Sequence, residues 1–215
     1  MVLNRMRRHI RSAPLLAFAL LASCSEAPQK KAETPKEPPK PAEPVSGSSA
    51  FFQMFAAARG WAADLEPLRL TSIHLPEVKR EPGKAAAWQA TFVSARLKRA
   101  RSYTYSVIEA PGNLHKGVFA GLDESWTGPK GPSRPFLIQA LKVDSIAAYE
   151  TALKKGKAAA EYSRKFPDKN IAFLLEQTNR FPTLTWRVIW GESVGTSNYS
   201  VFIDASSGNY LETMR

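Results

Sequence analysis

Four cationic side chains lie within six residues of this 215-residue chain, at Arg96, Lys98, Arg99 and Arg101. The segment lies between two apolar stretches predicted to be strands, so we expect a hairpin turn that presents the cations to solvent. Such a concentration of positive charge attracts phosphates and other anions. Two interpretations stay open, namely a solvated turn without a ligand and a binding site for anionic groups.

Other side chains that could bind a metal ion or catalyse a reaction are predicted to have no such role. His74 and His115 have no Cys, His or paired acid at ligand spacing, so we predict no metal site and no cofactor. Asp204 precedes Gly208 by four residues, a spacing typical of a carboxylate that stabilises a tight turn rather than one that binds a cation. The sequence lacks the GxSxG, HExxH, CxxC and glycine-rich phosphate-loop motifs, so no catalytic residue is assigned.

The predicted helix and strands that carry these groups occur twice in the sequence, as an internal repeat. A shift of 98 residues superimposes the aromatic and apolar positions of the two halves, and each half contains a tryptophan followed by alternating apolar residues. The matched strand residues are Trp88, Ala90 and Phe92 with Trp186, Val188 and Trp190. Alternation with period two predicts one buried face of a strand. We therefore predict that the three tryptophans pack in the core, with stacking on sugars or bases as the alternative.

Each half is predicted to be one helix followed by antiparallel strands, which makes the fold class α+β with two repeated units, each a helix on a small sheet. The first unit is predicted to have a helix at about 50–65 and strands near 70–75, 86–95 and 102–110. The second is predicted to have a helix capped by Asp144 and running to about Lys165, with strands at 171–176, 184–191 and 198–204 and a short one from Tyr210.

The N-terminus predicts export. Four arginines precede the apolar run from Ala13 to Ala22, which is too short to span a bilayer and is typical of a signal peptide. Leu21-Ala22-Ser23-Cys24 follows and resembles the lipobox of bacterial lipoproteins. The resemblance implies cleavage before Cys24, acylation of this residue with palmitate-like chains, and, because Ser25 rather than Asp follows, sorting to the outer membrane. A plain secretory signal with a chance cysteine is the alternative.

The next segment, from Ser25 to Ser49, is rich in proline, lysine and glutamate and has no aromatic residue. A segment of this composition cannot bury enough apolar surface to fold. We predict an extended, disordered stalk. A proline-rich ligand for a partner domain is the alternative.

The end of the second unit suggests a family. Trp186-Arg187-Val188 and the stretch from Tyr199 to Asn209, which contains Ile203-Asp204-Ala205-Ser206-Ser207-Gly208, resemble the end of a PepSY domain. Ser207 replaces the usual threonine, and the first unit has Glu109 in place of the aspartate. The resemblance implies a helix-plus-sheet fold outside the cytoplasm and a binding or inhibitory role without catalytic residues. A cystatin-like or NTF2-like domain would leave a similar pattern.

Together these features predict a lipid-anchored protein of the cell envelope that faces the periplasm and acts by non-catalytic binding. The predicted segments are 1–23 (signal peptide), 24–49 (lipidated Cys24 and stalk), 50–123 (first repeat), 124–140 (Gly/Pro connector) and 141–215 (second repeat). The expected partners are the membrane, through the lipid anchor, and an envelope protein or an anionic envelope polymer, but no nucleic acid. An inhibitor or chaperone-like module for an envelope protease or peptide is the first alternative, and an envelope hydrolase the second.

The lipid anchor gives a direct prediction. In cells, Cys24→Ala is expected to leave an unprocessed precursor that incorporates no labelled palmitate, because the thiol that accepts the diacylglycerol group is gone. Labelling of the wild-type chain and the variant side by side measures this. Normal palmitate incorporation by Cys24→Ala would contradict the lipoprotein prediction.

Overall fold

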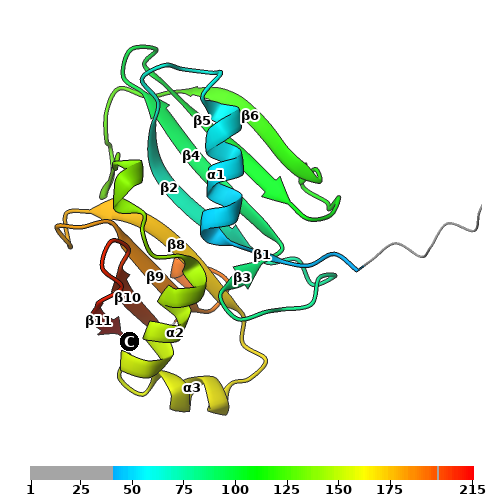
Figure 1. Cartoon of the computed structure of the whole chain (residues 1–215), viewed down its shortest axis with the longest axis vertical. Helices are drawn as coiled ribbons and strands as arrows, with labels where there is room; N and C mark the ends of the chain where they lie inside the picture. The colour runs from blue at the N-terminus through cyan, green and yellow to red at the C-terminus, as the bar shows by residue number, and fades with distance from the viewer. Residues whose placement is uncertain (1–40, 198) are drawn as a thin grey trace, which may run out of the picture. The chain divides into compact units, whose positions relative to one another are not determined.

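The computed structural model describes residues 41–197 and 199–215, which belong to one compact unit, Lys40–Arg215 (Figure 1). The predicted signal peptide, Cys24 and residues 25–40 of the predicted stalk lie outside the described residues. Regular structure begins with strand β1 (Val45–Ser46) and helix α1 (Gly47–Ala58), a few residues before the predicted start at Ala50. The last residues of the predicted stalk are therefore part of the folded unit.

The second predicted helix is divided into α2 (Ser145–Lys155) and α3 (Ala159–Lys165). Asp144 is its N-cap, as predicted, and its carboxylate accepts from the backbone N–H of Ser145. The division follows from Gly156, whose backbone is extended, and from Ala158, which has a left-handed conformation with a φ of +57°. A Cβ on Gly156 would lie 2.4 Å from the carbonyl oxygen of Ala152, so the chain can turn away from α2 here only without a side chain.

The predicted fold class, α+β, is confirmed. The predicted two small sheets are wrong, because the strands form one large antiparallel sheet. Its order is β11-β10-β9-β8-β2-β4-β5-β6, and β7 pairs with β8 beside this path. The bounds are β2 Glu66–Ile73, β4 Ala87–Ser94, β5 Arg99–Ser106, β6 Gly117–Ser125, β7 Ser133–Arg134, β8 Ile171–Thr178, β9 Thr185–Trp190, β10 Ser200–Asp204 and β11 Tyr210–Met214, with β3 (Lys84–Ala85) paired to β1 in a separate ribbon.

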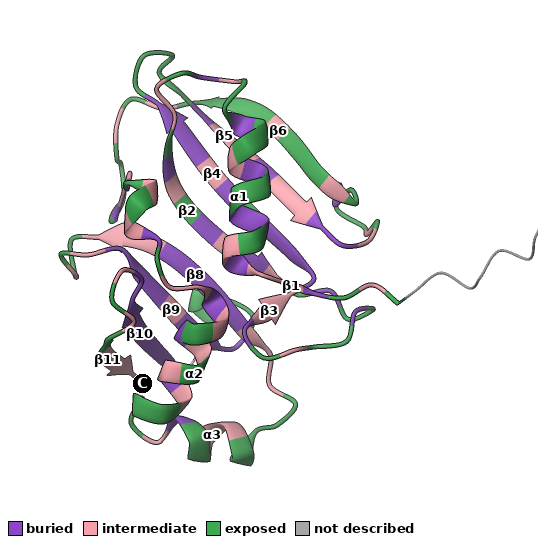
Figure 2. Cartoon of the chain, in the orientation of Figure 1, coloured by how far each residue is buried: buried purple, intermediate pink, exposed green. Residues whose placement is uncertain are grey.

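The two halves of the chain meet at β2 and β8. These strands pair antiparallel at Arg69 with Glu176, Leu70 with Leu175 and Thr71 with Leu174. Each half adds its later strands outward from this pair, so that β6 and β11 form the two edges of the sheet. Most residues of β6 are exposed (Figure 2), and this strand was not predicted because it lacks the alternation of apolar and polar residues that marks a half-buried strand.

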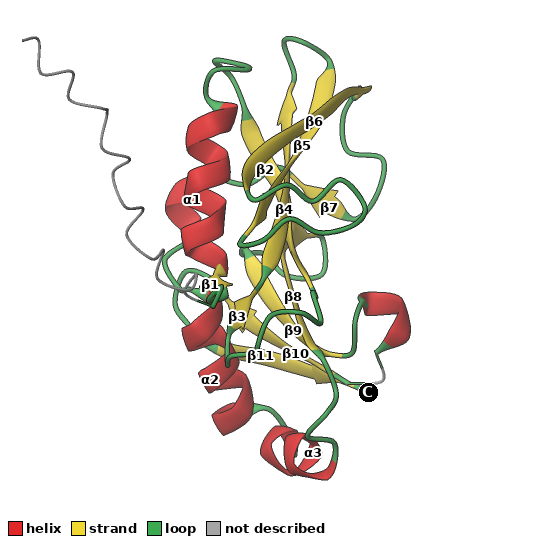
Figure 3. Ribbon diagram, turned by 90° about the vertical axis from the view of Figure 1, so that its right-hand side faces the viewer, coloured by secondary structure: helices red, strands yellow, loops and turns green. Residues whose placement is uncertain are grey.

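Helices α1 and α2 cover the same face of the sheet (Figure 3). The main core lies beneath them and draws on both halves of the chain. Trp88, Trp186 and Trp190 are fully buried in it, which confirms their prediction as core residues. The rings of Trp88 and Trp186 meet edge to face across the junction of the halves, with centroids 6.3 Å apart.

The starts of α1 and α2 are joined by hydrogen bonds. The carboxylate Oδ1 of Asp144 accepts from the backbone N–H groups of both Ser48, at 2.9 Å, and Ser145, at 2.6 Å, so one side chain caps two helices. The hydroxyl of Ser145 accepts from the N–H of Gly47 at 2.7 Å and donates to the carbonyl of Gly83 at 2.6 Å. The bonds from Gly47 and Ser48 and the bond to Gly83 form only when both halves are in place, so they tie the halves into one unit.

Close approach at this junction predicts that Gly47→Ala destabilises the fold. The added Cβ would lie 2.6 Å from Cη2 of Trp186 and 3.1 Å from Cη2 of Trp88, and both rings are fully buried. We expect a loss of about 1–3 kcal/mol in the free energy of unfolding, measured by chemical denaturation. Gly60→Ala is the matched control, because its Cβ would meet nothing closer than 3.8 Å. Equal stability of the two variants would contradict the packing described here.

Candidate functional site

The central strands β2 and β8 separate after three residue pairs. The backbone pairing of β2 with β8 ends at Thr71 and Leu174. At the next position the backbone N–H of Phe173 donates to the side-chain hydroxyl of Ser72, at 2.8 Å, instead of to a backbone carbonyl. Backbone groups that point toward a neighbouring strand alternate along the chain. By this alternation the next such groups belong to His74, just past the end of β2, and to Ile171, the first residue of β8.

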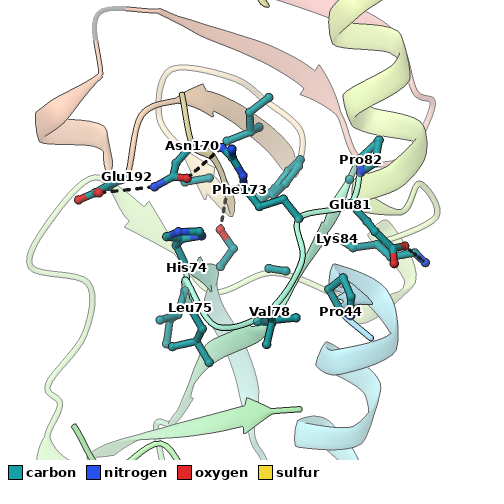
Figure 4. Close-up of a pocket in the computed structure, with 18 of the residues that line it drawn as sticks. Pro44, His74, Leu75, Val78, Glu81, Pro82, Lys84, Asn170, Phe173 and Glu192 are labelled. Carbon is teal, nitrogen blue, oxygen red and sulfur yellow. Dashed lines mark hydrogen bonds and ion pairs between the residues drawn. The ribbon is translucent and has the colours of Figure 1, made fainter. Parts of the chain in front are cut away.

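This separation opens a pocket with a volume of about 450 Å³ (Figure 4). Asn170 and Glu192 lie on one side of it and Glu81 and Lys84 on the other. The ends of β2 and β8 form part of its wall, together with the loops on either side and Tyr149 of α2. Its lining residues are Pro44, Ser72–Leu75, Val78–Ala86, Tyr149, Pro167, Lys169–Phe173, Gly191 and Glu192. We call this space the fork pocket.

Positive charge exceeds negative charge around the fork pocket. Its cationic residues are Lys79, Arg80, Lys84 and Lys169, and its carboxylates are Glu81 and Glu192. Lys84 and Glu81 form an ion pair at 2.7 Å, and this hydrogen bond raises the pKa of Lys84. Lys79 and Arg80 are exposed at the rim, so they can attract an anionic ligand.

Three hydrogen bonds hold the loops of the fork pocket. Arg80 donates from Nη1 to the carbonyl of Asp168 at 2.9 Å and to Oδ1 of Asn170 at 3.4 Å. Asn170 donates from Nδ2 to Oε1 of Glu192 at 3.5 Å. Over the part of the chain that the structure describes, no group of three or more His, Cys, Asp and Glu residues could hold a metal ion. The pocket offers free strand edges, positive charge and apolar contact.

The predicted basic turn is the hairpin between β4 and β5. The four cations lie together in sequence but have different surroundings. Arg101 donates from Nε to Asp123 and lies over the ring of Trp61, 5.3 Å from its centroid. The hydrogen bond from Arg101 lowers the pKa of Asp123, with a smaller contribution from Trp61. Arg101 is thus engaged within the fold.

The other cations of the turn are less engaged. Arg96 lies 3.8 Å from Asp64, with two thirds of its side chain exposed, while Lys98 occupies the turn itself with a φ of +52°. Arg99 is exposed at the first position of β5. The binding of anions by this turn stays a prediction for all four residues, and two of them, Arg96 and Arg101, already lie beside a carboxylate.

Asp204 is a turn residue, as predicted. Its Oδ1 accepts from the N–H of Ser206 at 2.7 Å, from the hydroxyl of Ser206 at 2.6 Å and from the N–H of Ser207 at 2.9 Å. Burial alone would raise the pKa of Asp204, but these hydrogen bonds outweigh it and lower the pKa to about 2. The carboxylate stabilises the β10–β11 hairpin as long as it is ionised.

The two histidines, His74 and His115, have different surroundings. His74 lines the fork pocket and is exposed. His115 lies 3.3 Å from the carboxylate of Glu109 and packs against Phe119.

The fork pocket was not predicted from the sequence, because Ser72 and Phe173, which meet at its edge, are 101 positions apart and belong to no motif.

The chain is similar in fold to a solved structure but matches no protein family. No protein-family model matches the chain, and no curated protein matches it. Among solved structures, one from Clostridium difficile 630, named "a putative lipoprotein", is similar at 10% sequence identity with a TM-score of 0.44, covering 82% of this chain and 95% of that one. Within the described residues, no helix has the length and apolar character needed to cross a membrane.

Proposed function

We propose that this chain is a lipid-anchored protein of the cell envelope that binds an extended polypeptide segment in the fork pocket without catalysing a reaction. The observation that carries the proposal is the separation of β2 and β8 at the Ser72–Phe173 hydrogen bond, which leaves two strand edges facing one pocket. The lipobox-like sequence at Cys24 supports the anchor. Its Ser25 supports a place at the outer membrane, facing the periplasm.

An extended polypeptide suits this geometry because a free strand edge binds other chains through backbone hydrogen bonds. The pocket volume of about 450 Å³ lies within the range of about 300–1,000 Å³ typical of sites for small ligands, enough for a few residues of a bound segment. Val78, Ala86 and Phe173 supply apolar contacts for alternate side chains of that segment. The excess of cations at the rim favours a segment with acidic residues.

The repeat supports the relation to tandem PepSY-like domains. The indole N–H of Trp88 donates to the carbonyl of Val45 at 3.1 Å, and that of Trp186 donates to the carbonyl of Val143 at 2.8 Å. Both members of the second pair lie 98 positions after those of the first, the same shift that relates the two halves of the sequence. In this proposal the two domains share one sheet, and their boundary forms the binding site.

Charge reversal at the rim tests the proposal. Residues 25–215, which contain the whole compact unit, are used to select binders from a random peptide library. We expect acidic peptides of strand-forming composition. The double variant Lys79→Glu/Lys169→Glu should weaken their binding about tenfold or more, measured by calorimetry, because each charge in or near the site changes sign.

The matched control is Lys154→Glu/Lys155→Glu, which makes the same change in charge on the exposed last turn of α2, outside the fork pocket. It should leave the affinity within about twofold, and melting temperatures should show that both variants fold. Equal loss of binding in the two variants would show that net charge alone is responsible. Selected peptides that are indifferent to both variants would overturn the fork pocket as the site.

A further inference from the structure

A second, smaller pocket lies at the other end of β8. Its volume is about 200 Å³, and it shares no lining residue with the fork pocket. Its lining residues are Pro132, Glu176, Thr178–Phe181, Thr185, Arg187 and Phe202. By register, Glu176 is opposite Thr185 and Arg187 is opposite Phe202, so these side chains share one face of the sheet. That face is opposite to the one that carries the core tryptophan Trp186.

Arg187 is an underpartnered cation in this pocket. Its Nε is buried and has no hydrogen-bond acceptor, and its Nη2 meets the weak acceptor Sδ of Met214 at 3.5 Å. Among the described residues no carboxylate forms an ion pair with it. Loss of solvent around the guanidinium lowers the pKa of Arg187, partly offset by the charge of Glu176.

The neighbouring acids are occupied by other partners. Arg180 donates to both carboxylate oxygens of Glu212, at 2.7 and 3.3 Å. On the other side, Glu176 accepts from the hydroxyl of Ser133 at 2.6 Å and from Arg69 at 3.4 Å. Three guanidinium groups therefore share two carboxylates, and the one left over is Arg187.

Aromatic rings define the remaining walls. Phe181 and Phe202 pack together with ring centroids 5.1 Å apart. The guanidinium of Arg187 lies over Phe202 at 5.2 Å, and that of Arg180 over the same ring at 5.1 Å. A ligand that enters here meets a cation and a phenyl surface at once. The volume is below the range of about 300–1,000 Å³ typical of drug-sized ligands, so the ligand is of single-amino-acid size.

We propose that the pocket around Arg187 is a second binding site, which takes a carboxylate attached to an apolar or aromatic group, such as the C-terminal residue of a peptide. The guanidinium supplies two parallel N–H donors that match the two oxygens of a carboxylate. The carboxylate of the ligand pairs with Arg187, which has no carboxylate partner in the protein, and the apolar group of the ligand packs on Phe181 and Phe202. This site does not depend on the fork pocket, because none of its residues lines that pocket.

The stability of the free protein fits this assignment. A partly buried cation without a full set of partners costs folding free energy, and an apolar residue of similar length avoids that cost. Arg187→Met is therefore expected to raise the melting temperature while it removes the ligand site. Such an exchange of stability for binding is the pattern of a functional residue.

The test uses residues 25–215 and a pair of probes, 3-phenylpropionate and 3-phenylpropanamide, which have the same ring but differ in charge. Calorimetry and ligand-observed NMR should show saturable binding of the acid, with the amide weaker by about tenfold or more. Arg187→Gln should lower the affinity for the acid to that for the amide. Arg164→Gln is the matched control on the exposed face of α3 and should change neither.

Three results would overturn the site. One is the absence of saturable binding of the acid by the wild-type chain at about 10 mM, a concentration that detects even millimolar affinity. The second is equal binding of acid and amide, which is measurable on the wild-type chain even if an Arg187 variant fails to fold. The third is unchanged binding of the acid by a folded Arg187→Gln variant.

Discussion

The double cap made by Asp144 is the constraint on which the rest of the structure depends. One carboxylate oxygen accepts from the N-terminus of α2 and from that of α1, which begins 98 positions earlier. Because both helix starts meet at this oxygen, the helices lie on the same face of the sheet, and the strands that follow them, β2 and β8, are brought side by side. Ser145 extends the joint to Gly83, in the loop that borders the fork pocket.

The fork pocket is a consequence of this joint. Two halves that each form a helix and a meander of strands are held together at their first strands, yet those strands pair at only three positions. The hydroxyl of Ser72 takes the place of the next backbone acceptor, and the strands then separate around the loops 76–86 and 167–170. The unpaired edges of β2 and β8 thus lie in the middle of the sheet, where the edge strand of another folded protein cannot pair with them. A single extended segment is narrow enough to enter the fork pocket and pair with them.

Local patterns predicted the local structure well. The alternation around Trp88 and Trp186 indicated strands with a buried face, and the spacing from Asp204 to Gly208 indicated a turn. The pairing of β2 with β8 was not predictable, because it joins residues more than 100 positions apart whose apolar pattern is satisfied equally by two separate sheets. The role of Arg187 was hidden for the same reason: its lack of a partner depends on which acids Arg69 and Arg180 occupy. At the helix break, a Cβ on Gly156 would come within 2.8 Å of atoms of Ala152 and Val201, and sequence periodicity does not report this crowding.

The central claim, that the space between β2 and β8 is a binding site, is tested most directly by NMR of residues 25–215 labelled with ¹⁵N, titrated with a peptide that the chain selects. We expect the backbone amides of His74 and Ile171 to shift most and to become protected from hydrogen exchange, because new backbone hydrogen bonds form there. Shifts that leave these amides unchanged and gather instead at the turn from Arg96 to Arg101 would contradict it.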